Sequence, residues 1–567
     1  MDDLKNEDIP LKGRFGRLQR FLPFAAFTAV FSFFAIYVFW GCWSTNVTFI
    51  APDDPIIFYT SFTDTFTVWV NNFLKTGKML PTDILWSGLI GSQLFCRELR
   101  YVAAIYFAAL GMAYFLRAHG LKALSSYGAG LLLAFSGYWF TLFSAGHAGW
   151  FVWMSYGVFV FGFIERALTE GRLRHWLLLG LFAAWGSFQQ ADLWFIFTAF
   201  SGVYFISRAI QLRVPLKGFL RGSLLASLVF FFVGAPGFRY ALTTDLKGRD
   251  KQISESKGTA LSGGESIEDS QARWIFITNW SLPPNESSEF FCSRINGDTS
   301  CPFVLSINAS KGIKPYTGAI GRPHMAKEGN YRQHSIYVGY VTCLLALIAV
   351  LSLFKARNPI VLFFTCAAVV FWLFSLGRYC EVFYRLVFAL PFGDYLRAPI
   401  KWHHLTEFCL CVLAGFGIGR LISLLESFMR GNANVARYMK YAVALLILVG
   451  VGNLAFEAKR FCAPVDYSKA IKGQCSSQLA VISRQQFMNP QVSEMVRNGQ
   501  IISVANWLGN PEAFLVQVLN PIKPPTPPKT DPIALAVGVI SLLCAVATVA
   551  FACCKKSSEI FLFKKDS

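Results

Sequence analysis

Residues 21–43 read FLPFAAFTAVFSFFAIYVFWGCW and contain no charged side chain. A helix needs about 20 mostly apolar residues to cross a hydrocarbon core of about 30 Å, so this stretch is long enough for one membrane span. Further apolar stretches follow, and together they predict about twelve transmembrane helices. These stretches lie near residues 101–117, 123–142, 150–167, 176–189, 191–207, 223–240, 336–354, 360–376, 403–424, 439–456 and 532–552.

The composition indicates the same class of protein. Of the 567 residues, 54% are hydrophobic, 16% are aromatic and only 15% are charged, and the mean hydropathy is +0.45. A soluble domain carries about a quarter charged residues. We therefore predict an all-α polytopic membrane protein. Residues 21–43 are expected to stay as its first span, because this run is too long for a cleavable signal peptide.

Positive charge predicts on which side of the membrane each connection lies. The net charge is +19, and Lys and Arg gather in alternate connections between the predicted spans. Short basic loops face the cytoplasm, which places both termini there and explains the charge without nucleic acid. The basic segments are 1–20, 117–122, 166–174, 208–221, 355–357, 420–440 and 553–567.

Four longer connections fall on the opposite, extracytoplasmic side, at 44–100, 241–335, 377–402 and 457–531. The first carries apolar residues at helical spacing, which predicts amphipathic helices on the membrane surface. The last ends in a Pro-rich run that predicts a stiff tether. The predicted domains are a cytoplasmic N-terminus (1–20), a transmembrane core with the first three loops (21–456), an extracytoplasmic segment with the tether (457–531), a last span (532–552) and a basic tail (553–567).

Two pairs of cysteines lie in the extracytoplasmic segments. Cys292 and Cys301 enclose one short loop, and Cys462 and Cys475 enclose another. Disulfides persist outside the cytoplasm, so we predict a disulfide within each pair. Zinc is not expected at these cysteines, because no CxxC spacing or matched His pair accompanies them.

Two adjacent carboxylates, Asp53 and Asp54, begin the first extracytoplasmic loop. Desolvating both is costly, so one is expected to hold a proton or both to bind a cation or a cationic partner. The alternative is a solvated turn, because prolines flank the pair on both sides.

Two short turns on the same side carry further polar residues. His147 lies in the turn between two spans, and Gln190 and Asp192 lie in the next extracytoplasmic turn. A lone interfacial His often only satisfies a helix end. The two neighbouring hairpins nevertheless place His147 and Asp192 near the same depth, so these three residues are candidates for substrate binding.

A third extracytoplasmic segment concentrates ionisable groups at the outer end of a span. An Arg fork suits phosphate oxygens and Lys supplies a point charge, whereas snorkelling to lipid headgroups is the alternative interpretation. A further carboxylate follows an aromatic, proline-stiffened loop. The candidate binding residues of these two segments are Glu286, Arg397, Lys401, His403, His404 and Glu407.

The order of these motifs resembles the YfhO-like family of bacterial membrane proteins, from about residue 20 to about residue 425. The motifs, in chain order, are Asp53-Asp54, Leu80-Pro81, Gly146-His147, the run Trp280-Ser281-Leu282-Pro283-Pro284, Tyr337-Val338-Gly339, and Arg397-x-Pro399-x-Lys401 leading into Leu413-Ala414-Gly415-Phe416-Gly417. That family is similar to the multispanning glycosyltransferases of the GT-C class. The resemblance therefore implies a GT-C-like fold in a bacterial inner membrane.

The resemblance also implies an activity and roles for particular residues. The expected reaction moves a sugar from a polyprenyl-phosphate carrier to an extracytoplasmic acceptor, which is a cell-envelope glycan, a lipid or a protein. Asp53 and Asp54 would act as general base or as ligands of a divalent cation, Mg²⁺ or Mn²⁺, although the pair is not a DxD motif. Arg397 and Lys401 would hold the phosphate, and polar groups such as His147 would line the sugar site.

Two other functions remain open at this point. A transporter or flippase of lipids or lipid-linked saccharides also needs cations at headgroup depth and about twelve spans. Such proteins commonly show two-fold repeats and broken helices near the midplane, whereas here the ionisable residues cluster on one face and no two-fold pattern is evident. A non-catalytic membrane subunit that binds a partner through its loops is the third possibility.

Overall fold

The computed structural model describes most of the helical part of the chain. Within this part the protein is all-helical apart from one pair of two-residue strands. The described residues are 14–42, 47–48, 70, 93–145, 147–188, 191–248, 250, 269–297, 316–320, 336–390, 393–428, 433–462, 465–466, 531–554, 557 and 559–563.

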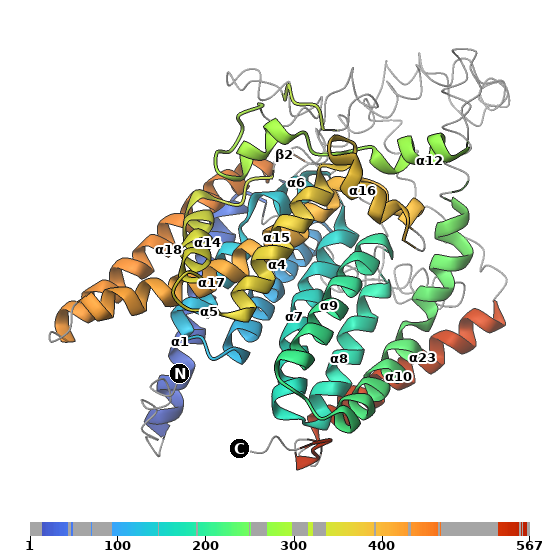
Figure 1. Ribbon diagram of the computed structural model, residues 1–567, viewed down its shortest axis with the longest axis horizontal. Helices are drawn as coiled ribbons and strands as arrows, with labels where there is room; N and C mark the ends of the chain where they lie inside the picture. Colours follow the sequence, from blue (N-terminus) through green and yellow to red (C-terminus); the bar gives the residue numbers. More distant parts are fainter. Residues whose placement is uncertain are drawn as a thin grey trace.

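The first half of the described chain is a series of helices that run up and down through the molecule (Figure 1). They are α1 (Arg14–Val38), α4 (Gln93–Ala118), α5 (Ala123–Ala134), α6 (Gly137–Ala145), α7 (Ala148–Glu170), α8 (Leu173–Trp185), the 3₁₀ turn η2 (Gly186–Phe188), α9 (Ala191–Gln211), α10 (Leu216–Tyr240) and the π-helical turn η3 (Ala241–Asp245).

The second half adds long helices and several short ones. These are α12 (Asp269–Thr278), η5 (Pro284–Phe290), α14 (Tyr340–Ser352), α15 (Pro359–Ser375), η6 (Gly377–Cys380), α16 (Glu381–Phe388), η7 (Gly393–Tyr395), η8 (Pro399–Trp402), α17 (His403–Phe428), α18 (Ala433–Phe461) and α23 (Pro532–Cys553). The strands β1 (Val47–Thr48) and β2 (Val465–Asp466) pair antiparallel, with Val47 opposite Asp466.

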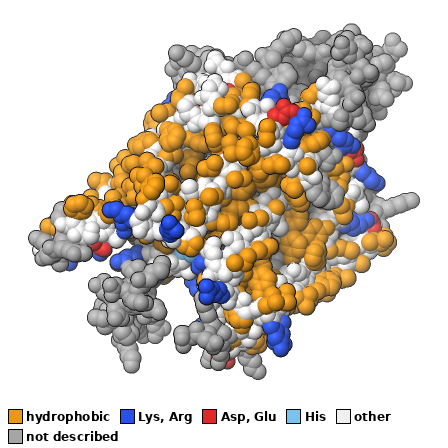
Figure 2. All heavy atoms as spheres, viewed as in Figure 1, with side chains coloured by type: hydrophobic (Ala, Val, Ile, Leu, Met, Phe, Trp, Pro, Cys, Tyr) orange, Lys and Arg blue, Asp and Glu red, His pale blue; other side chains and the backbone are white. Residues whose placement is uncertain are grey.

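Seven described helices are long and apolar enough to cross a membrane, and an eighth span results if α15 and α16 count as one bent span. The prediction of a membrane protein is therefore confirmed, and Figure 2 shows a broad band of hydrophobic side chains across one face. The number of about twelve spans stays a prediction. Some of the predicted stretches form helices that are short for a span: α8 and α14 have 13 residues each, about 20 Å at 1.5 Å per residue.

Local signals in the sequence explain several helix ends. The Asn358 side chain accepts hydrogen bonds from the first turn of α15, and Asp531 does the same for α23; a proline follows each cap. The hydrogen bond from Ala534 N–H and the Arg239 guanidinium hold the pKa of Asp531 below its usual range. At its other end, α7 stops at Gly171, which has a φ of 65° that favours glycine.

Close helix packing depends on small residues. A Cβ atom at Gly417 of α17 would lie 1.8 Å from the Leu345 carbonyl oxygen of α14, so only glycine permits this approach. Gly130 of α5 lies against the Ala109 carbonyl of α4 in the same way. The Gly417 contact thus sets α17 close against α14, and the first turn of α17 is buried.

The bundle has two distinct ends. The start of α1 and the end of α23 lie at one end, and α12 and α16 lie at the other, which we call the loop end (Figure 1). The C-terminal segment is tied to the turn between α7 and α8: Leu562 N–H donates to the Gly171 carbonyl at 2.9 Å, and Leu173 N–H to the Ile560 carbonyl at 3.0 Å.

Candidate functional site

A buried ion pair joins two segments that are far apart in the sequence. Asp192 lies in the first turn of α9, Lys401 lies in η8, and the Lys401 ammonium donates to the Asp192 carboxylate. Their side chains are only 2% and 7% exposed. The second carboxylate oxygen of Asp192 accepts a hydrogen bond from Leu193 N–H at 2.9 Å. Burying either charge alone would be costly, so the pair fixes η8 against α9.

The backbone around η8 is held in an unusual conformation. Ala398, just before η8, has a φ of 67°, and Trp280 has a φ of 66°, both in the left-handed region. Ala398 N–H donates to the Ile277 carbonyl at 3.2 Å, and Ile400 N–H to the Trp280 carbonyl at 3.1 Å. Such a backbone costs free energy that the surrounding contacts must offset, and it sets the position of Lys401.

Three ionisable side chains follow on the first turns of α17. His403, His404 and Glu407 are at most 1% exposed. His404 Nδ1 lies 3.9 Å from a Glu407 carboxylate oxygen, which is too far for a hydrogen bond. Ser136 lies beside Glu407, but neither carboxylate oxygen has a hydrogen-bonding partner of normal geometry among the described residues. The Glu407 carboxyl group therefore has fewer hydrogen bonds than a buried group with a purely structural role usually makes.

His147 belongs to the same group of residues. It is the residue before the first turn of α7, and its backbone N–H donates to the Leu142 carbonyl at 3.1 Å. Its ring, the Lys401 ammonium and the His403 ring all lie within electrostatic range of His404. We call His147, Asp192, Lys401, His403, His404 and Glu407 the site cluster.

The site cluster lies where three helices begin. Asp192, His403 and His147 mark the starts of α9, α17 and α7. Helix N-termini carry partial positive charge and present N–H groups. Together with Lys401, these helix starts suit an anionic group.

Two other predicted binding residues have separate partners. The Arg397 guanidinium is half-buried and lies over the Phe276 ring, 5.2 Å from its centroid. Glu286 accepts hydrogen bonds from Tyr316 Oη at 2.5 Å and Ala319 N–H at 2.6 Å, so it anchors a loop. Burial and the neighbouring Glu286 raise the pKa of Tyr316 well above its usual range.

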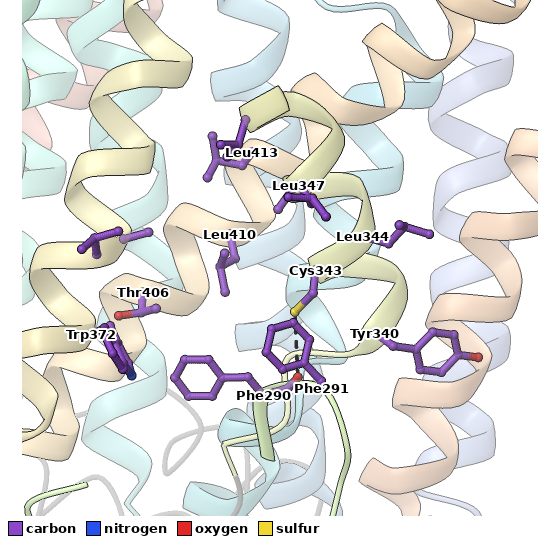
Figure 3. Close-up of a pocket in the computed structure, with 14 residues that line it drawn as sticks. Phe290, Phe291, Tyr340, Cys343, Leu344, Leu347, Trp372, Thr406, Leu410 and Leu413 are labelled. Atoms are coloured by element: carbon purple, nitrogen blue, oxygen red, sulfur yellow. Dashed lines mark hydrogen bonds between the residues drawn. The ribbon is translucent and has the colours of Figure 1, made fainter. Parts of the chain in front are cut away.

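An apolar groove lies on the side of the bundle (Figure 3). Its volume is about 520 Å³, and α14, α15 and α17 form its walls. Leu344, Leu347 and Val369 line it and are about half exposed, so the groove opens sideways toward lipid. Phe290 also lines it and packs on the His403 ring at 4.6 Å between centroids.

A second cluster of buried polar residues was not predicted from the sequence. It contains His119, Glu165, Tyr204 and Arg208 and joins the ends of α4, α7 and α9 that are opposite the loop end. Arg208 donates to both oxygens of Glu165 at 2.8 and 2.7 Å, and Tyr204 Oη donates to one of them at 3.1 Å. A Glu inside the apolar stretch 150–167 is a signal that could have found it.

Several predicted residues lie outside the described part of the chain. These are Asp53, Asp54, Gln190, Cys301 and Cys475. The base, the metal site and both disulfides therefore stay predictions, as do the surface helices of the first loop. No group of three or more His, Cys, Asp or Glu residues with metal-binding geometry occurs among the described residues.

The fold and the site cluster define a polytopic helical membrane protein with a polar centre that adjoins a lipid-accessible groove. No protein-family model matches the chain, and no curated protein matches it either. The resemblance to YfhO-like proteins thus stays a prediction based on the motifs in the sequence.

Proposed function

We propose that the protein is a membrane glycosyltransferase that takes a sugar from a polyprenyl-phosphate donor. The observation that carries this proposal is the apolar groove that is lined by Phe290, whose ring packs on His403 of the site cluster. A substrate with a long hydrocarbon chain and a charged head needs this combination of an apolar lateral groove and buried polar groups.

The roles of individual residues follow from this arrangement. The isoprenoid chain lies along α14 and α17, and the phosphate lies near Lys401, Arg397 and the three helix starts. The acceptor oxygen attacks the anomeric carbon while the bond from that carbon to the phosphate oxygen breaks. The phosphate leaves with the bonding electrons, the acceptor proton passes to Asp53 or Asp54, and the configuration at the sugar carbon inverts.

The same proposal assigns the sides of the membrane. Basic residues at the end of the bundle opposite the loop end face the cytoplasm of a bacterial inner membrane. Examples are Arg166 and Arg172 beside the α7–α8 turn. The loop end with the site cluster then faces outward, and about twelve spans connect the two sides. The acceptor is an extracytoplasmic glycan, lipid or protein.

A transfer assay with the full-length protein in lipid nanodiscs tests the proposal. The donors are radiolabelled polyprenyl-phosphate hexoses, and an envelope extract supplies the acceptor. We expect Asp53→Asn and Asp54→Asn to lower transfer by about 100-fold or more, because each removes a candidate base. Asp2→Asn, in the predicted cytoplasmic N-terminus, is the matched control and should leave transfer unchanged.

Two outcomes would overturn this assignment. If both Asp variants transfer sugar at the wild-type rate, the catalytic role of the pair is wrong. If the wild-type protein never transfers sugar but moves a fluorescent polyprenyl lipid across proteoliposome membranes, the protein is a transporter, for which the same groove would bind the lipid chain.

A further inference from the structure

Helix α16 leaves the preceding helix at a steep angle. The axes of α15 and the η6–α16 segment differ by 112°, so α16 lies close to the membrane plane if α15 crosses it. One face of α16 packs on the protein: Tyr384 and Val387 are at most 1% exposed, and the Trp274 ring of α12 lies 6.2 Å from the Tyr384 ring.

A second face of α16 carries an exposed apolar stripe. Val382 and Leu386, four residues apart in α16, are 79% and 61% exposed, and Leu390, two residues beyond the end of the helix, is 50% exposed. Residues at this spacing lie on one side of a helix. Glu381 and Arg385 form an exposed ion pair on a third face, beside the stripe.

The apolar stripe continues an exposed apolar surface on α15. Leu362, Val369 and Val370 on the outside of α15 are 53%, 50% and 39% exposed, and α15 leads through η6 directly into α16. A helix with one apolar, one packed and one charged face is typical of a segment in the plane of the membrane surface.

We propose that α16 is an interfacial helix whose Val382 and Leu386 side chains, together with Leu390 just beyond its end, are immersed in the acyl region of the leaflet at the loop end. The occupant of this surface is bilayer phospholipid. This inference does not depend on which reaction the site cluster performs.

The lipid contact also sets the depth of the candidate site. Tyr384, on the packed face of α16, donates its hydroxyl proton to the Leu396 carbonyl at 3.1 Å. Leu396 directly precedes Arg397, and Lys401 follows within the next turn. An α16 held in the interface therefore holds these two cations at headgroup depth, where a lipid phosphate lies.

Photo-crosslinking of the full-length protein tests this inference. Benzoylphenylalanine is placed by amber suppression at Val382, Leu386 or Arg385, and at Val369 in α15 as the lipid-facing reference. The protein is irradiated in nanodiscs of phosphatidylethanolamine and phosphatidylglycerol, and adducts are identified by mass spectrometry. Val382 and Leu386 should give phospholipid adducts at a yield similar to Val369 and about ten-fold above Arg385.

The other outcomes would overturn the inference. Adducts at Val369 without adducts at Val382 and Leu386 would place α16 in water. Crosslinks from Val382 and Leu386 to another segment of the chain or to a second copy would show that protein covers the stripe. Elution of each variant at the wild-type volume in size-exclusion chromatography confirms that the fold is retained.

Discussion

Two fully buried carboxyl groups, at opposite ends of the bundle, have very different surroundings. Glu165 of the second cluster is 1% exposed and accepts three hydrogen bonds, two from Arg208 and one from Tyr204. Glu407 of the site cluster is also buried, but it has no hydrogen-bonding partner of normal geometry among the described residues. Burying either carboxyl group costs desolvation free energy, and hydrogen bonds among the described residues offset this cost only for Glu165.

This difference in hydrogen bonding distinguishes a structural role from a functional one. A fully satisfied buried network stabilises one arrangement of helices, and the bonds around Glu165 join α7 to α9 in this way. A buried polar group without such partners is the exception in native proteins and calls for another explanation. We interpret the second cluster as a structural connection and the site cluster as a place reserved for a polar ligand.

The largest expected effect comes from breaking the second cluster. Arg208→Leu would leave Glu165 buried without its main partner, which should lower the free energy of unfolding by about 3–5 kcal/mol. Thermal unfolding of the detergent-solubilised protein measures this loss. Arg385→Leu is the control, because Arg385 is exposed and its contacts with Glu381 and with the Trp274 ring are each worth about 0–1 kcal/mol. Equal losses for the two variants would contradict the structural role of the second cluster.

Breaking the ion pair of the site cluster should reduce both stability and sugar transfer. Lys401→Met would leave Asp192 buried and unpaired, so it should reduce stability, and it should also lower sugar transfer by about 10²–10³-fold. The double variant Lys401→Met with Asp192→Asn removes the stranded charge. We expect this double variant to regain most of the stability but none of the transfer, as measured by thermal unfolding and the nanodisc assay.

The double variant distinguishes a structural role of Lys401 from a role in phosphate binding. If it regains transfer together with stability, Lys401 only supports the fold. If Lys401→Met alone keeps full transfer, the cation does not bind the phosphate at all.

A direct comparison of the two carboxyl groups uses the same substitution at each. Glu165→Gln should reduce stability by about 3 kcal/mol or more, because Arg208 then lacks its counter-charge. Glu407→Gln should change stability by less than about 1 kcal/mol, since it replaces a group with few bonds to lose. Thermal unfolding of both variants measures the contrast, and a larger loss for Glu407→Gln would reverse our interpretation of the two clusters.

The sequence predicted the part of the site that depends on neighbouring hairpins. His147 and Asp192 were expected at one depth, and both belong to the site cluster. The pairing of Asp192 with Lys401 was not predictable, because 209 positions separate them and no local pattern links them. Glu286 was predicted as a binding residue, but its loop partners appear only in three dimensions.

The groove, like the Asp192–Lys401 pair, could not be predicted from the sequence. Hydrophobic runs predict where helices cross the membrane, and the described part of the structure has seven helices that are long and apolar enough to do so. The groove depends on how α14, α15 and α17 pack side by side, which no single run encodes. Stripes on single helices are different: Val382 and Leu386 have helical spacing in the sequence, so the apolar face of α16 was available before the fold was known.

The smallest expected effect tests whether the groove serves the site cluster. Ala346 of α14 lines the groove and is 2% exposed, so Ala346→Trp would fill part of the space for a hydrocarbon chain. We expect the KM for a polyprenyl-phosphate donor to rise by about ten-fold while kcat changes little, because lost chain binding acts on substrate and transition state alike. Leu543→Trp, on the exposed side of α23, is the matched control and should change neither constant. An unchanged KM for Ala346→Trp would separate the groove from the reaction and leave the site cluster to be explained without a lipid chain.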